Sequence, residues 1–388
     1  MAKQVRTIAV VTGTRAELGL LAPVMRAIDA QPGLRLRVVV AGLHLVSGTW
    51  RSVASDWGFT VDAKVRMQRR GEVGRAADVQ AVGRGVAGFG AVFGEMRPDV
   101  VLVLGDRIEA FAAATAASVG GIRVAHVHGG DRAEGVADEA MRHAISKLAH
   151  LHYPATALSR RRLVRMGERA EHVVRVGSPA VDELLLRQRR IAREPGHVLV
   201  MQHPVGGNDA EEQRWMRGTL SAATAFAREA GHDVLVFDPN ADAGSDGVRA
   251  AIERWMGRDP ALRRRAPQSG RTGERRRYAY LPRGAFLALL RQSMAIVGNS
   301  SAGLIEAAVL HVPCVNIGPR QAGREQAGNV INCDYGQANV RAALKRAAAM
   351  DLRGLRHPYG KGDAGRRMAA HLAGVDFARV VVRKRNGY

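Results

Sequence analysis

The densest group of side chains capable of acid–base chemistry lies between residues 126 and 143. His126 and His128 lead into a Gly–Gly pair, and four acidic residues follow within nine positions: Asp131, Glu134, Asp138 and Glu139. Two glycines let the backbone approach a ligand closely. Carboxylates near histidines supply general acids and bases, and neighbouring carboxylates push their pKa values apart. We expect at least one of these carboxylates to take part in catalysis.

Structural roles are open to the same residues. A divalent metal could bind such a set, but the spacing matches no metal motif, so no metal is expected. Some of the acidic residues must cap the helix expected from about Ala137 to Leu148. Glu139 and Arg142, three positions apart, could form an ordinary pair on the surface of that helix.

Two further turns in the first half follow apolar runs. Gly13–Thr14–Arg15 follows Thr7–Val11, and Gly105–Asp106–Arg107 follows Val100–Leu104. A helix N-terminus at the carboxyl edge of a parallel sheet binds anions, and Arg15 adds a donor suited to phosphate. A carboxylate after a parallel strand lies where ligands usually bind. The alternatives are a tight turn with a surface arginine, and an N-cap for Asp106.

The second half carries small residues and hydroxyls from Gly298 to Glu306. A helix expected to begin near Gly303, with Ser300 and Ser301 before it, could hold a diphosphate on its free N–H groups. Glu306, one turn later, could accept hydrogen bonds from ribose hydroxyls. Arg320 and Arg324 could close over the same diphosphate. His203, held extended by the proline after it, could project into the same site, although a lone histidine at a strand end is more often structural.

Two α/β halves must position these residues. Buried runs of β-branched residues followed by helices indicate parallel βαβ units, and the pattern restarts at Val198–Met201. Two Rossmann-like domains facing a cleft are therefore predicted, with boundaries at 1–183 and 184–365 and a final helix in 366–388 that could cross back to the first domain. The remaining strands are expected at Leu36–Ala41, Val124–Val127, Val174–Val176, Val234–Phe237, Tyr278–Leu281, Met294–Val297 and Val315–Ile317, and two further helices at Phe286–Ser293 and Gly303–Leu310.

Composition narrows the class of protein. The chain has 388 residues, two cysteines and a formal charge of +22. No disulfide framework is possible, and no apolar run is long enough to span a membrane, so a cytoplasmic enzyme is expected. Six of the 58 basic residues are lysine, which indicates a compositional bias toward arginine. With 5% aromatic residues and no nucleic-acid-binding signature, the charge is not taken to indicate a nucleic-acid partner, and Arg263–Arg277 is interpreted as a solvated loop.

Taken together, these motifs resemble those of the UDP-N-acetylglucosamine 2-epimerase family, most closely its hydrolysing branch from sialic-acid pathways. The matching stretches occur in the family's order: residues 11–24, 41–45, 105–117, 125–153, 176–184, 202–205, 297–307 and 312–333. The resemblance implies a GT-B arrangement of two Rossmann-like domains, with a UDP-sugar bound in the interdomain cleft. It also implies a homodimer or homotetramer, and neither a cofactor nor a metal.

The resemblance also assigns roles to individual residues. Asp106 would be a catalytic carboxylate and His203 would lie near the leaving phosphates, while Asp131, Glu134 and Asp138 remain alternatives for the second carboxylate, with Asp131 and Asp138 favoured. Arg15 and Arg324 would bind the diphosphate, and Glu306 the ribose. The remaining residues expected to bind substrate are His44, His128, Ser300, Ser301, Ala302, Gly303 and Arg320.

The implied reaction eliminates UDP across C1–C2 of the sugar, adds water to the glycal and releases the sugar with C2 inverted. The non-hydrolysing branch has a glutamate where this chain has His128, and a lysine where it has Leu20, and both differences favour the hydrolysing reading. Residues 46–50 depart from the family pattern. The substrate could therefore be UDP-N-acetylglucosamine or a relative such as UDP-N,N'-diacetylbacillosamine. A non-hydrolysing epimerase and a GT-B-like glycosyltransferase are the alternatives.

Overall fold

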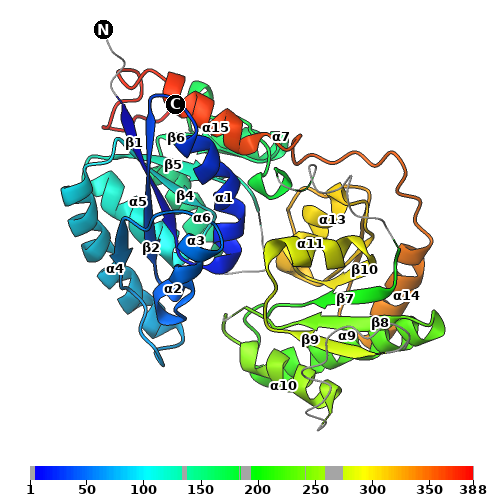
Figure 1. The fold of residues 1–388 in the computed structure, drawn as a ribbon. Coiled ribbons are helices and arrows are strands. Elements are labelled where there is room, and N and C mark those ends of the chain that lie inside the picture. The colour runs from blue at the N-terminus through cyan, green and yellow to red at the C-terminus, as the bar shows by residue number, and fades with distance from the viewer. Residues whose placement is uncertain are drawn as a thin grey trace. The chain divides into compact units, whose positions relative to one another are not determined.

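The computed structural model describes residues 5–132, 138–182, 184, 194–240, 242–257 and 274–387, without the side chain of Asp138. It contains two compact units. The first comprises the described residues up to 182 and the segment 358–387, and the second comprises the described residues from 184 to 357. Figure 1 shows each unit as a sheet with helices packed against it.

The first unit is built on a six-stranded parallel sheet in the order β3-β2-β1-β4-β5-β6. Strands β1, β2, β4 and β5 each contain a buried run made mostly of Val, Ile, Leu and Ala, as strands covered on both faces require. The strands are β1 Arg6–Thr12, β2 Leu34–Ala41, β3 Ala63–Val65, β4 Val100–Leu104, β5 Arg123–Val127 and β6 Leu151–Tyr153.

Helices cover both faces of this sheet. One core lies beneath α1 and α15, and the other beneath α4, α5 and α6. The helices of the first unit are α1 Arg15–Asp29, α2 Leu43–Val46, α3 Ser52–Ser55, α4 Arg75–Met96, α5 Ile108–Val119, α6 Asp138–Leu148, α7 Ala157–Arg165 and α15 Ala364–Gly374.

The second unit repeats the topology. Its parallel sheet has the order β12-β11-β10-β7-β8-β9, and, as in the first unit, two crossovers leave the central pair of strands in opposite directions. The strands are β7 His197–Met201, β8 Asp233–Phe237, β9 Arg275–Tyr278, β10 Ser293–Gly298, β11 Cys314–Ile317 and β12 Val330–Cys333. The helices are α9 Asp209–Glu229, α10 Ser245–Met256, α11 Arg283–Arg291, α12 Ser301–Leu304, α13 Glu306–Val309 and α14 Gln337–Ala348.

This strand order fixes where ligands are expected. In a doubly wound sheet the connections leave in opposite directions on either side of the first strand, and a crevice opens at the carboxyl ends of the two central strands. Those strands are β1 and β4 in the first unit and β7 and β10 in the second. The prediction of two Rossmann-like domains is confirmed.

The C-terminal segment returns to the first unit earlier than expected. The contacts place Pro358 onward with that unit, whereas the sequence suggested a boundary after residue 365. Asp182 explains the attachment, because its carboxylate accepts hydrogen bonds from the backbone N–H groups of Ala364 (2.9 Å) and Gly365 (2.7 Å) at the start of α15. In Figure 1, α15 lies beside the elements of the first unit.

Three sequence predictions of elements were wrong. Val174–Val176 forms no regular strand, and β6 supplies the sixth strand instead. The strand expected at Tyr278–Leu281 lies at Arg275–Tyr278, so the end of the arginine-rich segment is an edge strand rather than a loop, while residues 263–273 lie outside the described residues. The helix expected at Gly303–Leu310 is broken at Ile305 into α12 and α13.

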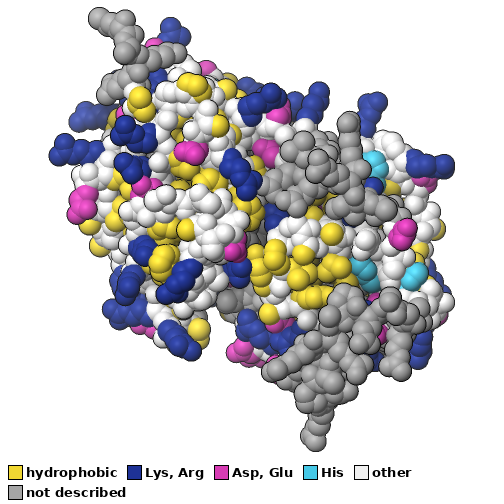
Figure 2. Space-filling view, in the orientation of Figure 1, with side chains coloured by type: hydrophobic (Ala, Val, Ile, Leu, Met, Phe, Trp, Pro, Cys, Tyr) yellow, Lys and Arg dark blue, Asp and Glu magenta, His cyan; other side chains and the backbone are white. Residues whose placement is uncertain are grey.

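Charge is distributed rather than concentrated on the face that Figure 2 shows. Basic side chains are scattered across it and acidic side chains lie among them. Within the described part of the chain, no helix is both long and apolar enough to cross a membrane.

Candidate functional site

Asp106 follows β4 at the central crevice of the first unit and forms an ion pair with Arg142 of α6. The Arg142 side chain is 5% exposed and that of Asp106 is 19% exposed. The carboxylate is therefore held by a buried cation and keeps some surface that a ligand can contact. Arg142 also donates to the backbone oxygen of His128 (3.3 Å). The pairing of Glu139 with Arg142 on a helix surface was therefore wrong; Glu139 contacts Arg132 and His143 instead.

His126, at the end of β5, fixes the backbone next to Asp106. Its Nε2 lies 2.7 Å from the carbonyl oxygen of Gly105, and its Nδ1 lies 3.0 Å from the hydroxyl of Ser146. Burial lowers the pKa of His126 to about 3, so the ring is neutral. Because a carbonyl only accepts, Nε2 carries the proton. The single proton of the Ser146 hydroxyl is within reach of both Nδ1 and the backbone oxygen of Arg142 (3.0 Å). His126 is therefore a structural link between α6 and the residue preceding Asp106.

His128 and Asp131 form a second buried group after β5. The Asp131 carboxylate lies 2.9 Å from Nδ1 of His128 and accepts a hydrogen bond from the Ser159 hydroxyl (2.6 Å). Nε2 of His128 lies 3.0 Å from the hydroxyl of Ser178. His128 has a left-handed backbone (φ 65°), which this set of contacts holds in place. Asp131 and His128 are 5% and 6% exposed. Their side chains therefore stabilise the loop and leave little surface for a ligand to contact.

The other two acidic candidates give no geometry. Glu134 lies outside the described residues, and of Asp138 only its place at the start of α6 is described. Of the predicted catalytic carboxylates whose side chains the structure describes, Asp106 is therefore the more exposed, and its position is set by the ion pair with Arg142.

The turn after β1 is not a free anion site. Glu17 Oε2 accepts the backbone N–H of Gly13 (2.6 Å), and Thr14 caps α1 by accepting the N–H of Glu17 (3.3 Å). Burial raises the pKa of Glu17 to about 7. A carboxyl group thus already occupies the position at the helix N-terminus that we expected for phosphate. Arg15 is half-exposed and lies 3.6 Å from Asp56.

His44 also braces the turn after β1. It is fully buried, with Nε2 3.2 Å from the Thr12 hydroxyl and Nδ1 3.0 Å from the Thr49 hydroxyl, and burial lowers its pKa to about 4. In this conformation it has no exposed surface with which to contact a substrate. Gly42, two residues earlier, has φ 56°, and a Cβ there would lie 2.5 Å from Glu109 Oε1, so the close approach requires glycine.

In the second unit, Asn299 holds His203 at the central crevice. The Asn299 side chain accepts the backbone N–H of His203 (2.7 Å) and donates to its carbonyl (2.8 Å), linking the ends of β7 and β10. Nδ1 of His203 accepts the backbone N–H of Asn240 (3.2 Å), so the neutral ring carries its proton on Nε2. Burial, with a smaller contribution from Arg320, lowers the pKa of His203 to about 3.

The Ser300–Glu306 segment contains the short helix α12 and the first residue of α13 rather than the start of one long helix. Ser300 caps α12 by accepting the N–H of Ala302 (3.3 Å), and Ser301 is half-buried. Gly303 packs against Cys314, whose Sγ would lie close to an added Cβ. Glu306 is 6% exposed and pairs with Arg283 at 3.4 Å.

Two arginines were expected to close over a diphosphate. Arg320 donates to the backbone oxygen of Asn299 (3.3 Å), together with the side chain of Gln321 (2.9 Å), so it supports the loop that holds His203. Arg324 is half-buried three residues beyond Gln321. Among the described residues no group of three His, Cys, Asp or Glu side chains is placed to hold a metal ion.

Several residues of these two sites were not singled out from the sequence. Arg142 and Asn299 stood inside recognised motifs, but nothing in the sequence showed that they contact Asp106 and His203. Buried polar atoms near His203 also lack a hydrogen-bond partner: Gln202 Nε2, Asn240 Oδ1 and Gln321 Oε1. Such atoms favour a polar ligand or water at this edge.

Two six-stranded parallel sheets, each with its polar residues at the central crevice, define the GT-B type of protein with two Rossmann-like domains. The solved UDP-GlcNAc 2-epimerase of Methanocaldococcus jannaschii, in complex with UDP-GlcNAc and UDP, shares this fold with a TM-score of 0.76 at 17% identity, covering 94% of this chain and 99% of that one.

Sequence comparison then gives the family. The model of the UDP-N-acetylglucosamine 2-epimerase family matches residues 26–373. A Legionella pneumophila protein, UDP-N,N'-diacetylbacillosamine 2-epimerase (hydrolyzing), is 32% identical over 99% of this chain and all of its own length. A Neisseria meningitidis UDP-N-acetylglucosamine 2-epimerase is 28% identical over 88% of this chain and 87% of its own. The chain belongs to the UDP-N-acetylglucosamine 2-epimerase family, which confirms the resemblance.

Proposed function

We propose that the protein is a hydrolysing 2-epimerase that converts UDP-N-acetylglucosamine and water to UDP and N-acetylmannosamine. The observation that carries the chemistry is Asp106, a partly exposed carboxylate paired with the buried guanidinium of Arg142. A cation in direct contact favours the charged form of a carboxyl group, which is the form a general base requires.

In the proposed reaction, Asp106 takes the proton from C2 of the sugar. The electron pair of the C2–H bond forms the C1–C2 double bond. The C1–O bond breaks at the same time, and UDP leaves with the electron pair of the C1–O bond. Water then adds its oxygen to C1 of the glycal while a second acid group gives a proton to C2 on the opposite face. The proton that the water loses restores that acid group, and Asp106 releases the proton it took from C2 to solvent. The product is the free sugar with inverted C2, so one water is consumed for each UDP released.

The second unit would bind the leaving group. His203 is neutral and presents an Nε2–H that no protein group accepts in the described contacts, so it can donate to a phosphate oxygen without carrying a charge itself. The hydroxyls of Ser300 and Ser301 and the side chains of Arg320 and Arg324 are the further groups proposed for the diphosphate, with Glu306 for the ribose.

The identity of the sugar is the second part of the proposal. The relative from Legionella is named for UDP-N,N'-diacetylbacillosamine, and it matches this chain over nearly its full length. That sugar nucleotide is therefore the alternative substrate, and it undergoes the same chemistry at C1 and C2.

A product assay tests both parts. The purified protein is incubated separately with each UDP-sugar, UDP release is followed by a coupled assay and the sugar is identified by NMR. One equivalent of free 2-epimeric sugar per UDP supports the proposal, and the faster substrate identifies the sugar. Formation of the epimeric UDP-sugar without free sugar would indicate a non-hydrolysing epimerase, and no reaction with either compound contradicts the proposal.

A further inference from the structure

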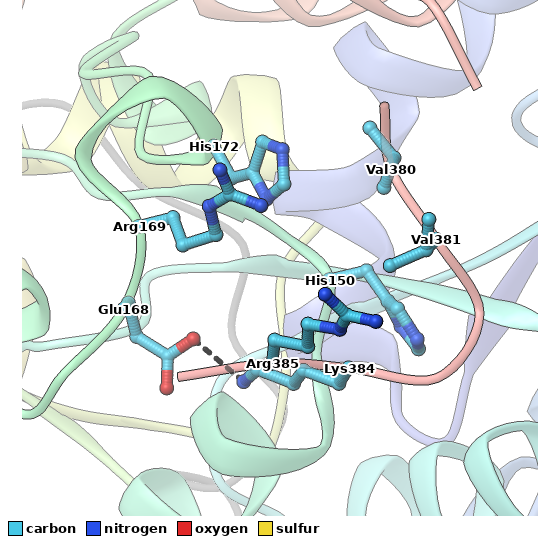
Figure 3. Close-up of a pocket in the computed structure, with 8 residues that line it drawn as sticks. All are labelled: His150, Glu168, Arg169, His172, Val380, Val381, Lys384 and Arg385. Atoms are coloured by element: carbon cyan, nitrogen blue, oxygen red, sulfur yellow. Dashed lines mark ion pairs between the residues drawn. The ribbon is translucent and has the colours of Figure 1, made fainter. Parts of the chain in front are cut away.

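The tail that follows α15 is held on the first unit by a half-buried lysine, Lys384. The ammonium group of Lys384 lies 2.6 Å from Glu168 Oε2 and donates to the backbone oxygens of Ser146 (3.1 Å) and Lys147 (2.7 Å). Figure 3 shows Lys384 joined to Glu168 by this ion pair, and both residues line a small pocket together with His150 and His172. The Lys384 side chain is 20% exposed and that of Glu168 is 1% exposed.

Glu168 is the centre of this network. Besides Lys384, its carboxylate lies 2.9 Å from Lys147 Nζ and 2.9 Å from His152 Nε2. Burial opposes ionisation, but the hydrogen bonds and charges of these three partners hold the pKa of Glu168 at about 2. Removing one partner of a buried, charged carboxylate strongly destabilises the folded protein. The contact with Glu168 therefore holds the Lys384 ammonium group in a defined position.

Other contacts hold the rest of the tail. Arg123 donates to the backbone oxygens of Phe377 (3.0 Å) and Val380 (2.8 Å), and Gly387 donates to the backbone oxygen of Gly167 (2.7 Å). His150 contacts the carbonyl of Val382 through Nε2 (2.9 Å). The tail therefore has a defined path over the first unit, from α15 to Gly387.

The two carbonyls that Lys384 binds belong to the last turn of α6. The final carbonyl groups of a helix carry partial negative charge, and a cation there stabilises the helix end. Lys384 thus acts as a cap on α6 that is supplied from a segment more than two hundred residues away in the chain.

The same helix supports Asp106 by two routes. Arg142, one turn before Ser146, forms the ion pair with Asp106. The Ser146 hydroxyl lies 3.0 Å from Nδ1 of His126, and His126 donates to the carbonyl of Gly105, the residue before Asp106. A continuous set of contacts therefore runs from the tail through α6 to the candidate catalytic carboxylate.

We propose that Lys384 is a positioning residue for the reaction: by holding the C-terminal end of α6, it fixes Arg142 and the Ser146–His126 hydrogen bonds against Asp106. This inference rests on the proposed function of Asp106. Lys384 itself does not touch the substrate, so its removal changes the rate of the chemical step and leaves nucleotide binding by the second unit intact.

The test compares Lys384→Met, Lys384→Arg and a control, Arg383→Met, which removes a positive charge from an exposed position on the same tail. Thermal unfolding first establishes the temperature at which all variants are folded. Because displacements far from the chemistry are costly, K384M is expected to lower kcat by about 10- to 100-fold, with KM and the Kd for UDP changed by less than about twofold. K384R is expected to recover most of the lost kcat, and R383M to match the wild type.

Hydrogen exchange of the α6 amides supplies a readout that does not depend on turnover. The proposal predicts faster exchange along α6 in K384M than in R383M. A folded K384M with wild-type kcat, or with unchanged α6 exchange, overturns the proposal, as does a loss of kcat that merely tracks the folded fraction or that K384R does not reverse. If the wild type releases no UDP from any UDP-sugar, the proposed function fails, and the exchange measurement still decides whether Lys384 holds α6.

Discussion

The two central crevices share a doubly wound topology but differ in the polar groups at the ends of their central strands. In the first unit the candidate acid–base groups are charged or ring groups whose partners are already in place: Asp106 with Arg142, and Asp131 with His128 and Ser159. In the second unit the His203 ring is neutral, and its Nε2–H has no acceptor in the described contacts. Buried polar atoms without a hydrogen-bond partner occur in both units: Gln202 Nε2 and Asn240 Oδ1 in the second, and Gln68 Oε1 and Glu109 Oε1 beside Gly42 in the first. An unpaired buried polar atom costs about 1–3 kcal/mol, which a bound ligand can recover.

This difference indicates a division of labour. A prearranged charge accelerates a reaction because it needs no reorganisation when the substrate arrives. A neutral donor such as the Nε2–H of His203 instead adds to binding energy once a ligand accepts its hydrogen bond. The first unit is therefore interpreted as the part that performs the chemistry and the second as the part that binds the nucleotide. The predictions for Asp106, Asn299 and His203 below separate the two.

The largest effect is expected for Asp106→Asn. An amide cannot accept the C2 proton, so kcat for UDP release should fall by about 1,000-fold, within the range for general acid–base catalysis. The Kd for UDP, measured by calorimetry, should change by less than about threefold because the binding groups belong to the second unit. Glu95→Gln, at an exposed position on α4, is the control. A D106N variant that retains activity would remove Asp106 from the mechanism.

The second prediction concerns Glu17, whose buried carboxyl group has a pKa of about 7 against an ordinary value of 4.5. Because the folded state then binds the proton more tightly than the unfolded state, the free energy of unfolding falls as pH rises through this window. Glu17→Gln has no such proton to lose. Its stability relative to the wild type should rise by about 3 kcal/mol between pH 4 and pH 8, measured by chemical denaturation. A difference that does not vary with pH contradicts the burial argument.

A smaller effect is expected for Asn299→Ala, which removes both hydrogen bonds that hold the backbone of His203. Without these hydrogen bonds His203 is less well positioned, and a loss of about 1.4 kcal/mol in binding free energy, comparable to one hydrogen bond, should raise the Kd for UDP by about tenfold. Under saturating substrate, kcat should change less than the Kd does. Gln337→Ala, an exposed amide on α14, should bind UDP as the wild type does. If N299A binds UDP normally, the brace on His203 is not needed for binding.

The last prediction is that the contribution of His203 to the binding free energy of UDP does not change with pH. Since burial lowers its pKa to about 3, the ring stays neutral throughout the neutral range. The ratio of the Kd for UDP in His203→Gln to that in the wild type should therefore stay constant within about twofold from pH 5 to pH 8. Using the ratio cancels the titration of UDP itself. An inflection near the ordinary histidine pKa of about 6.5 would show that His203 binds as a cation.

The sequence predicted the central strands well, because runs such as Val100–Leu104 are buried on both sides and can be read from composition alone. Short or polar edge strands were missed or misplaced. β3 and β6, with three residues each, were missed, and β9, which contains three arginines, was expected three residues later in the chain. At an edge strand one side of the backbone is unpaired, so apolar periodicity is weaker there.

The site was predictable only where a residue follows a strand. Asp106, His128, His203 and Ser300 could be placed at sheet edges from their position in the chain. Their partners could not: Arg142 reaches Asp106 from a helix, and Lys384 reaches α6 from the tail. Periodicity places a residue on a face of its own element, but it gives no information about which distant residue that face meets.

The central claim is that Asp106 removes the C2 proton and that water, not UDP, ends on C1. The most direct measurement is the reaction of the wild type in D₂O with UDP-N-acetylglucosamine and with UDP-N,N'-diacetylbacillosamine, with the products followed by NMR. The account predicts UDP and free 2-epimeric sugar in equal amounts, with one deuterium at C2 of every product molecule. Product that retains its original hydrogen at C2, or an epimeric sugar still attached to UDP, would contradict it.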